Sequence, residues 1–270
     1  MPNLAVILLL TVAVHCVDTA SYASRIAGVR TGRLALTGAL FSIVSLLSRV
    51  ANTLQAPLLG AAVDRLVHQG NVGDLLRGFH FIIAAASAGT LLGAMLIPTF
   101  TSLFSRGALA YEAHGSFLAL VIHTLSTRGF SRISQHFRLP LPESVRKASR
   151  FNLPRSYFLL TALVTAVYTV GVSSTIYASA LTPELVRTAT TLSGVVNGVG
   201  TLLFVILVDP VSALITDQAL RGSRPVSAVS HIVIWQVAGR FAGTLLAQLL
   251  FVPAALLVVK VAHLLMRLLA

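Results

Sequence analysis

The stretch SLLSRVANTLQAP, residues 45–57, places Arg49, Asn52 and Gln55 at steps of three inside an otherwise apolar run. Residues three apart lie on one side of a helix, so a guanidinium and two amides share a face. An ionised group inside a bilayer is costly unless it faces water or a partner. This stripe therefore predicts a hydrated, functional cavity, and the alternative is one-sided packing against a neighbouring helix.

Two further polar stripes have helical spacing. The first comprises His15, Asp18, Thr19, Tyr22 and Arg25, and the second comprises Gln236, Arg240, Thr244 and Gln248. We predict that the three stripes converge on one hydrated cavity, with Arg49 and Arg240 as its cations and Asp18 as the counter-charge. The alternative for Asp18 is a structural salt bridge with Arg25 or Arg49. His15, beside it, is a candidate for relaying a proton, and the alternative is that it is only hydrogen-bonded.

The composition places these stripes in a membrane. The chain has 270 residues, of which 56% are hydrophobic and 10% charged, whereas about 25% are charged in a soluble domain. A bilayer core needs roughly 20 apolar residues in a helix. We therefore predict an all-α integral membrane protein with six transmembrane helices, at residues 4–22, 34–56, 79–104, 157–180, 188–208 and 230–252.

The basic residues predict how the chain is oriented. There are 20 Lys plus Arg against 8 Asp plus Glu. Arg25, Arg30 and Arg33 follow the first span, and the connector 105–155 holds eight basic residues against two acidic ones. Because cytoplasmic loops are enriched in Lys and Arg, we expect a cytoplasmic connector and an N-terminus outside. These short basic loops suit anionic membrane lipids, whereas nucleic acid requires a soluble basic face.

Two segments outside the spans are interpreted as interfacial amphipathic helices. Residues 116–125, SFLALVIHTL, are too short to cross a bilayer. In the tail 253–270, Lys260, His263 and Arg267 share one helical face. With six spans and an external N-terminus, the tail is expected to lie outside the cell. Its basic charge conflicts with this expectation, because Lys and Arg are enriched on the cytoplasmic side.

Short motifs recur in order at offsets of 153 to 157 residues: YAS, VRT, AGTLL and a proline–aspartate pair. We interpret 1–104 and 156–252 as two three-span repeats, separated by the connector 105–155 and followed by the tail 253–270. An odd number of spans per repeat makes the second repeat inverted. The paired prolines predict helix breaks or gating points, unless they merely end spans at the interface. The positions concerned are Pro57, Asp64, Pro210 and Asp217, with Pro98 and Pro253 as a second proline pair.

The sequence gives no sign of catalysis. It has no P-loop, no G-x-S-x-G, no histidine spacing suited to a metal and no paired carboxylates on a common helix. We expect no enzyme activity, no metal and no cofactor. Two guanidiniums with little acid suit an anionic substrate, because arginine binds phosphate oxygens with two parallel hydrogen bonds. The residues thus favour a transporter or flippase for a phosphorylated molecule.

Two segments carry a family resemblance. YASRIAGVRTGR (22–33) and SRVANTLQAPLLGAAVD (48–64) resemble signature segments of the Amj family, the alternate lipid II flippases of bacteria, which are unrelated in sequence to the MurJ exporters. The resemblance implies movement of undecaprenyl-pyrophosphate-linked disaccharide pentapeptide from the inner to the outer leaflet of the bacterial cytoplasmic membrane. The motif positions that it covers are Arg25, Arg30, Arg33, Arg49, Asn52, Gln55 and Asp64.

The resemblance does not assign roles to individual residues, so the following roles are our own interpretation. The basic loop of Arg25, Arg30 and Arg33 captures pyrophosphate at the cytoplasmic mouth, and Arg49 and Arg240 hold it midway. The amides of Asn52, Gln55 and Gln236 bind the sugar and peptide, and Asp18 or His15 couples the cycle to protons or membrane potential. The alternatives are a secondary transporter of a small anion and a non-transporting scaffold for cell-wall enzymes. A homodimer is one option for the assembly.

Overall fold

The computed structural model describes residues 4–70, 72–115 and 155–269. The predicted interfacial segment 116–125 and most of the connector lie outside the described residues. Within these ranges the chain is helical and has no strand, and six helices are long and apolar enough to cross a membrane. The prediction of an all-α membrane protein with about six transmembrane helices is confirmed.

The first half contains four helices. They are α1 (Leu4–Ala20), α2 (Ala23–Thr31), α3 (Leu34–His68) and α4 (Val72–His114). A turn at Ser21 and Tyr22 separates α1 from α2, so the first membrane segment has two parts. The helix α3 continues through Pro57, and α4 continues through Pro98 to ten residues beyond the predicted third span.

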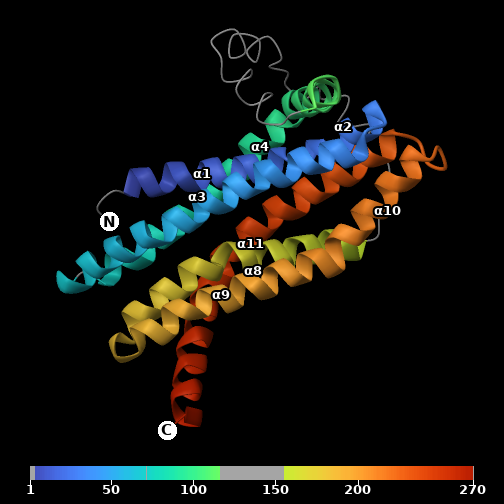
Figure 1. The fold of residues 1–270 in the computed structure, drawn as a ribbon. Helices are drawn as coiled ribbons and strands as arrows, with labels where there is room; N and C mark the ends of the chain where they lie inside the picture. The colour runs from blue at the N-terminus through green and yellow to red at the C-terminus, as the bar shows by residue number, and fades with distance from the viewer. Residues whose placement is uncertain (1–3, 71, 116–154, 270) are drawn as a thin grey trace.

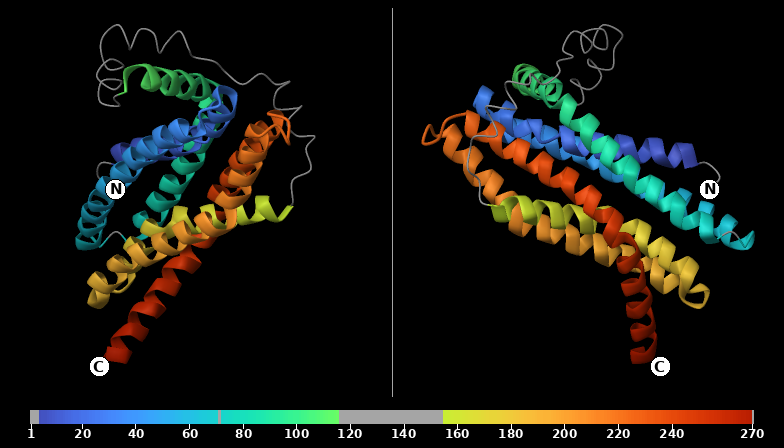
Figure 2. Two further views of the ribbon diagram at one scale, coloured as in Figure 1. Left: turned by 45° about the vertical axis from the view of Figure 1, so that its right-hand side comes forward. Right: turned by 180° about the vertical axis from the view of Figure 1, so that it is seen from behind.

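The second half is interrupted more strongly. Its elements are α8 (Arg155–Leu181), the 3₁₀ turn η1 (Pro183–Leu185), α9 (Val186–Leu203), the π-helical turn η2 (Phe204–Val208), α10 (Asp209–Leu220) and α11 (Ser227–Leu269). The tail, predicted to be a separate amphipathic helix, instead continues α11 through Pro253. Figure 2 shows α11 bending away from the bundle toward its C-terminal end.

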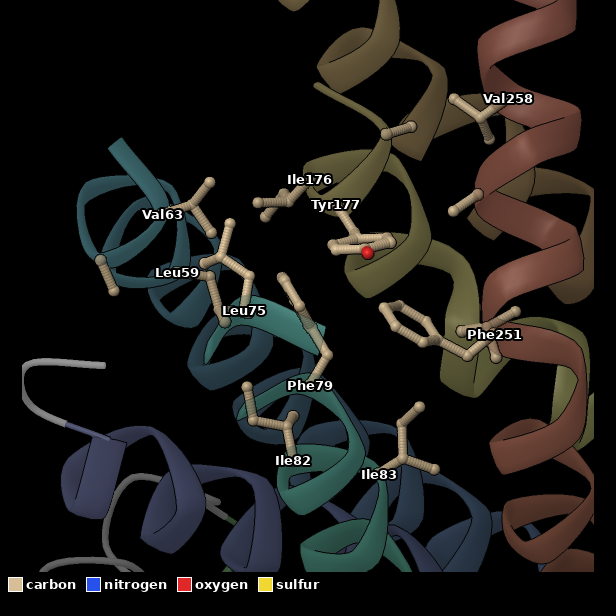
Figure 3. Packing of buried hydrophobic residues seen from close by; sticks show 14 of the residues in the cluster. Leu59, Val63, Leu75, Phe79, Ile82, Ile83, Ile176, Tyr177, Phe251 and Val258 are labelled. Atoms are coloured by element: carbon tan, nitrogen blue, oxygen red, sulfur yellow. The ribbon is translucent and has the colours of Figure 1, made fainter. Parts of the chain in front are cut away.

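The arrangement of the two halves is visible in Figures 1 and 2. The helices α1 and α8 run in opposite directions, and α11 crosses behind α8 and α9 in Figure 1 and in front of them in the view from behind. An aromatic cluster joins the halves: the ring centroids of Phe79 (α4) and Tyr177 (α8) each lie 5.3 Å from that of Phe251 (α11). Figure 3 shows Leu59 and Val63 of α3 beside this cluster.

Glycines bring the first and third membrane segments of each half into close contact. A Cβ on Gly89 of α4 would collide with the Val12 carbonyl oxygen of α1, and one on Gly243 of α11 would collide with the Ala162 carbonyl oxygen of α8. Small residues let membrane helices approach in this way. Both glycines belong to the repeated AGTLL motif, so the motif marks the same kind of helix contact in each half.

Replacing Gly89 by alanine should destabilise the folded protein, because the new methyl group would meet backbone that cannot rotate away. The matched control is Gly60→Ala in α3, where an added Cβ has no atom within 4 Å. Alanine is favoured over glycine in a helix by about 1 kcal/mol, so the control should unfold at an equal or higher temperature in detergent. Equal melting of Gly89→Ala and Gly60→Ala would contradict the packing.

Candidate functional site

A cavity of about 230 Å³ lies between the two halves of the protein. Its lining comes from the first half through α1, the following turn and α3, and from the second half through α8, α9, η2, α10 and α11. The polar and charged lining residues are Asp18, Ser21, Tyr22, Ser45, Arg49, Thr165, Tyr168, Thr201, Asp209 and Arg240. The cavity is therefore a charged site inside a chain dominated by apolar helices.

The most deeply buried charges of the cavity form an ion pair. Arg240 Nη2 of α11 donates to Asp18 Oδ2 of α1 at 3.0 Å, and the two side chains are 10% and 18% exposed. Arg240 Nη1 also lies 3.4 Å from the Tyr22 hydroxyl. Asp18 is therefore the counter-charge of Arg240, and the suggested salt bridges from Asp18 to Arg25 or Arg49 are not formed. The pair links the two halves, because each half supplies one partner.

A second ion pair links the halves with the charges exchanged. Arg25 of α2 donates from Nη2 to Asp209 Oδ1 at the start of α10. Asp209 also lines the cavity. The first half thus supplies an acid to one pair and a base to the other, and the two pairs hold α1 and α2 against α10 and α11.

The position of Asp209 depends on the local helix geometry. Pro210 has no N–H to donate to the carbonyl four residues earlier, so it removes one hydrogen bond of a regular α-helix. The chain forms the π-helical turn η2 immediately before the Asp209–Pro210 pair. Such turns often mark functional sites because they change the direction of the side chains that follow. Of the two prolines predicted to break the second span of a repeat, Pro210 lies two residues after the π-helical turn, whereas Pro57 stays inside a continuous α-helix.

Arg49 lines the same cavity from α3. Its side chain is exposed, and it makes no ion pair with the part of the chain that the structure describes. Arg49 and Arg240 therefore contribute positive charge to one cavity, one of them free and the other paired. A free guanidinium there can bind an anion without first breaking a contact.

Three other members of the first two polar stripes line a second, smaller cavity of about 40 Å³. His15, Asn52 and Gln55 contribute to it, and Gln55 Nε2 donates to the Thr11 hydroxyl at 2.6 Å. Tyr168 lines both cavities. The predicted single cavity is thus two neighbouring ones, because α3 turns Arg49 and Gln55 toward different parts of α1 and α8.

Three of the four residues of the third stripe contact the first half. Below Arg240, Thr244 accepts a hydrogen bond from Ser87 at 2.9 Å, and Gln248 lies 2.6 Å from His80 Nδ1, both on α4. Gln236 is fully buried one turn before Arg240, lines neither cavity, and its side-chain amide has no partner among the described residues. Only Arg240 of this stripe reaches the main cavity.

The remaining predicted residues lie outside the cavity. Arg30 is exposed on α2, and Arg33 donates from Nε to Glu112 at the end of α4, which raises the pKa of the Arg33 guanidinium. Asp64 is exposed near the end of α3, and Asp217 pairs with Arg221 one turn later. Within the described ranges, no three His, Cys, Asp or Glu side chains are grouped to hold a metal ion.

Asp209 and Tyr168 are among the cavity residues that sequence reasoning missed. Asp209 follows an apolar run directly and precedes a proline, so the predicted span ended before it. In the structure the helical segment that contains it runs from Pro183 to Leu220 and is long enough to cross a membrane. The dipeptide Asp–Pro inside a long apolar stretch was the available signal.

These features define a class: a polytopic α-helical membrane protein with a charged cavity between two halves, as a membrane transporter requires. The family model described as "Amj: Alternate to MurJ" matches residues 10–262, so the chain belongs to the Amj family. A curated relative from Bacillus subtilis (strain 168), named "Lipid II flippase Amj", is 34% identical over 243 residues, covering 90% of each chain. No solved structure matches the chain significantly.

Proposed function

We propose that this protein is a lipid II flippase, which moves the undecaprenyl-pyrophosphate-linked peptidoglycan precursor from the inner to the outer leaflet of the bacterial cytoplasmic membrane. Membership of the Amj family and the name of its relative support this function. The observation that carries it is the cavity between the halves, where Arg49 makes no ion pair with any described residue and Arg240 is buried. The function is transport and involves no bond breaking.

The cavity chemistry suits the pyrophosphate of such a lipid. Its phosphate oxygens accept hydrogen bonds from guanidinium groups in pairs. Arg49 provides the first contact because its charge is not engaged, and Arg240 provides a second, deeper one. Asn52 and Gln55 line the neighbouring cavity of about 40 Å³, so their amides bind a sugar or peptide group only in a conformation that opens this cavity further.

The prenyl tail of the substrate needs a path that stays in lipid. On α3, the neighbours of Arg49 include Leu46, Val50 and Leu54, which are 50–64% exposed. Across the cavity, α9 and η2 expose Val199, Leu202, Val205 and Ile206. We place a lateral opening between α3 and α9, where the pyrophosphate enters the cavity while the tail remains among these apolar side chains.

The orientation and the repeats form part of the proposal. The N-terminus lies outside and the connector is cytoplasmic, where its basic residues and those of α2 contact anionic lipids. Residues 1–104 and 156–252 are inverted repeats, a relation supported by the opposite directions of α1 and α8 and by the shared glycine contacts. With this orientation, Arg25, Arg30 and Arg33 stand on the cytoplasmic side and collect the substrate.

The test is complementation in cells whose own lipid II flippases can be shut off, with outer-leaflet lipid II measured by a periplasmic cleavage assay. The native chain should restore flipping, and Arg49→Ala should reduce it at least about tenfold, as expected for loss of one charged hydrogen-bonding partner. Arg187→Ala is the matched control, because Arg187 is exposed on α9 outside the cavity.

Each outcome has a distinct meaning. If Arg49→Ala flips lipid II as well as Arg187→Ala at equal membrane levels, the cavity is not the transport site. If the native chain fails to restore flipping at good membrane levels, transport of a smaller anion replaces lipid II as the leading function.

A further inference from the structure

The Asp18–Arg240 pair leaves much of the arginine's hydrogen-bonding capacity unused. A guanidinium has five N–H donors, and Arg240 directs them to Asp18 and Tyr22 alone among the described residues. Its Nε is buried without a partner, as is the Gln236 amide one turn earlier on α11. Buried donors without acceptors are rare in proteins and call for an explanation. An anion bound in the cavity at Arg240 would supply acceptors for the unused donors of this guanidinium.

An anion cannot join Arg240 while Asp18 stays ionised beside it. Two like charges at one buried site repel strongly, and the usual result is that the weaker acid binds a proton. A pyrophosphate with one ester group on each phosphorus keeps its two negative charges near neutral pH, because both remaining hydroxyls are strong acids. Asp18 is therefore the group that must become neutral.

The surroundings of Asp18 allow this exchange. The charged or titratable groups on the elements around it are His15 and Tyr22 on its own side of the bundle, Arg49 on α3, Tyr168 on α8, Asp209 on α10 and Arg240 on α11. His15 lies one turn before Asp18, is 7% exposed, and its Nδ1 has no partner in the described part of the chain. It lines the smaller cavity, whose 40 Å³ is enough for a water molecule.

We propose that binding of a pyrophosphate at Arg240 is coupled to uptake of one proton by Asp18, delivered through His15 from the smaller cavity. This proposal rests on the proposed function and adds its coupling. Arg240 Nη2 stops donating to Asp18 Oδ2 and donates to a phosphate oxygen instead. Asp18 Oδ2 receives a proton that solvent supplies to His15, and His15 returns to its neutral form.

The sign of the pH dependence follows from proton counting. The complex with the lipid holds one more proton than the free protein, so lower pH favours binding. In the pH range where free Asp18 is ionised, the affinity should rise about tenfold for each unit of pH decrease. Exchange of Asp18 for asparagine removes the titrating group while keeping a side chain of the same shape.

The experiment uses the full chain in detergent with purified lipid II as the probe. In weakly buffered solution, a pH indicator should report uptake of about one proton per lipid bound by the native protein. Asp18→Asn should bind lipid II without taking up a proton and with an affinity independent of pH. His15→Gln should take up the same amount of proton more slowly.

Three results would overturn the proposal. They are binding by the native chain without proton uptake, an affinity that does not change with pH, and undiminished uptake by Asp18→Asn. The first two use only the native protein, so they decide the matter even if Asp18→Asn fails to fold. If the native chain binds no lipid II, the proposed function fails and this coupling fails with it, a result distinct from binding without protons.

Discussion

A chain in which Asp18 and Arg240 are both replaced by leucine should fold and insert normally but move no lipid II. Removing both partners leaves neither of them as an unpaired buried charge, and replacing a buried ion pair by apolar side chains is often neutral or stabilising. Transport should be lost because the buried cation of the cavity is gone. The unfolding midpoint in detergent and the periplasmic cleavage assay in flippase-depleted cells measure the two effects separately.

The single substitution Asp18→Leu should behave differently. It leaves the 10% exposed Arg240 side chain without its carboxylate, and breaking a buried pair in this way costs about 3–5 kcal/mol. We expect this variant to have a lower unfolding midpoint and a lower level in the membrane than the double variant.

The matched control removes an exposed ion pair elsewhere. His263 Nε2 lies 3.6 Å from Glu184 Oε1, and the two side chains are 36% and 60% exposed. Exposed pairs contribute about 0–1 kcal/mol, so Glu184→Gln with His263→Gln should alter neither folding nor flipping. Flipping by the Asp18→Leu/Arg240→Leu variant at the level of this control would show that the pair is only structural.

The polar stripes show what helical periodicity can and cannot predict. Spacing of three and four placed Arg49 and Arg240 correctly on single helix faces, and both line one cavity. Spacing could not predict that Asp18 pairs with Arg240, because the partner depends on how α1 docks against α11 in three dimensions. The tight approach of α1 to α4 through Gly89, and of α8 to α11 through Gly243, sets that docking.

Of the third stripe, only Arg240 lines the main cavity. Thr244 and Gln248 contact Ser87 and His80 on α4, so they join the halves instead of lining the cavity. A polar residue on a membrane helix is costly whether it meets a substrate or another helix, and a single sequence does not separate the two causes. The distinction required the neighbours of each residue.

The helix lengths explain the miss at Asp209. Hydropathy marks the stretch that sits in the bilayer core, whereas a helix continues until its hydrogen bonding ends. The segment around α9 was ended at residue 208, where a charge and a proline follow. In the structure the π-helical turn η2 directly precedes that charge and proline, which begin α10, and the helical segment continues to Leu220. The residue that pairs with Arg25 was therefore placed outside the membrane segment.

Exchanging the charges of Arg25 and Asp209 should restore much of the flipping that either single reversal removes. Arg25→Asp places two carboxylates together, and Asp209→Arg places two guanidiniums together, so each single variant separates α2 from α10. The double variant restores an ion pair in which α2 carries the acid and α10 carries the base. We expect each single variant to lose at least about tenfold in flipping rate, and the double variant to regain most of it. The coupling lies within the range of about 0.5–3 kcal/mol for contacting residues.

The degree of rescue separates two roles for Arg25. Asp209 is 42% exposed, but each reversal both removes an attraction and adds a repulsion, so two tenfold losses that are largely regained place the coupling toward the upper end of that range. If Arg25 acts by closing the two halves against each other, the direction of the pair does not matter and the double variant works. If Arg25 instead binds pyrophosphate from its own position on α2, the exchange moves the cation away and the double variant stays inactive at a normal membrane level. Measured flipping by the double variant thus decides whether Arg25 holds the halves together or contacts the substrate.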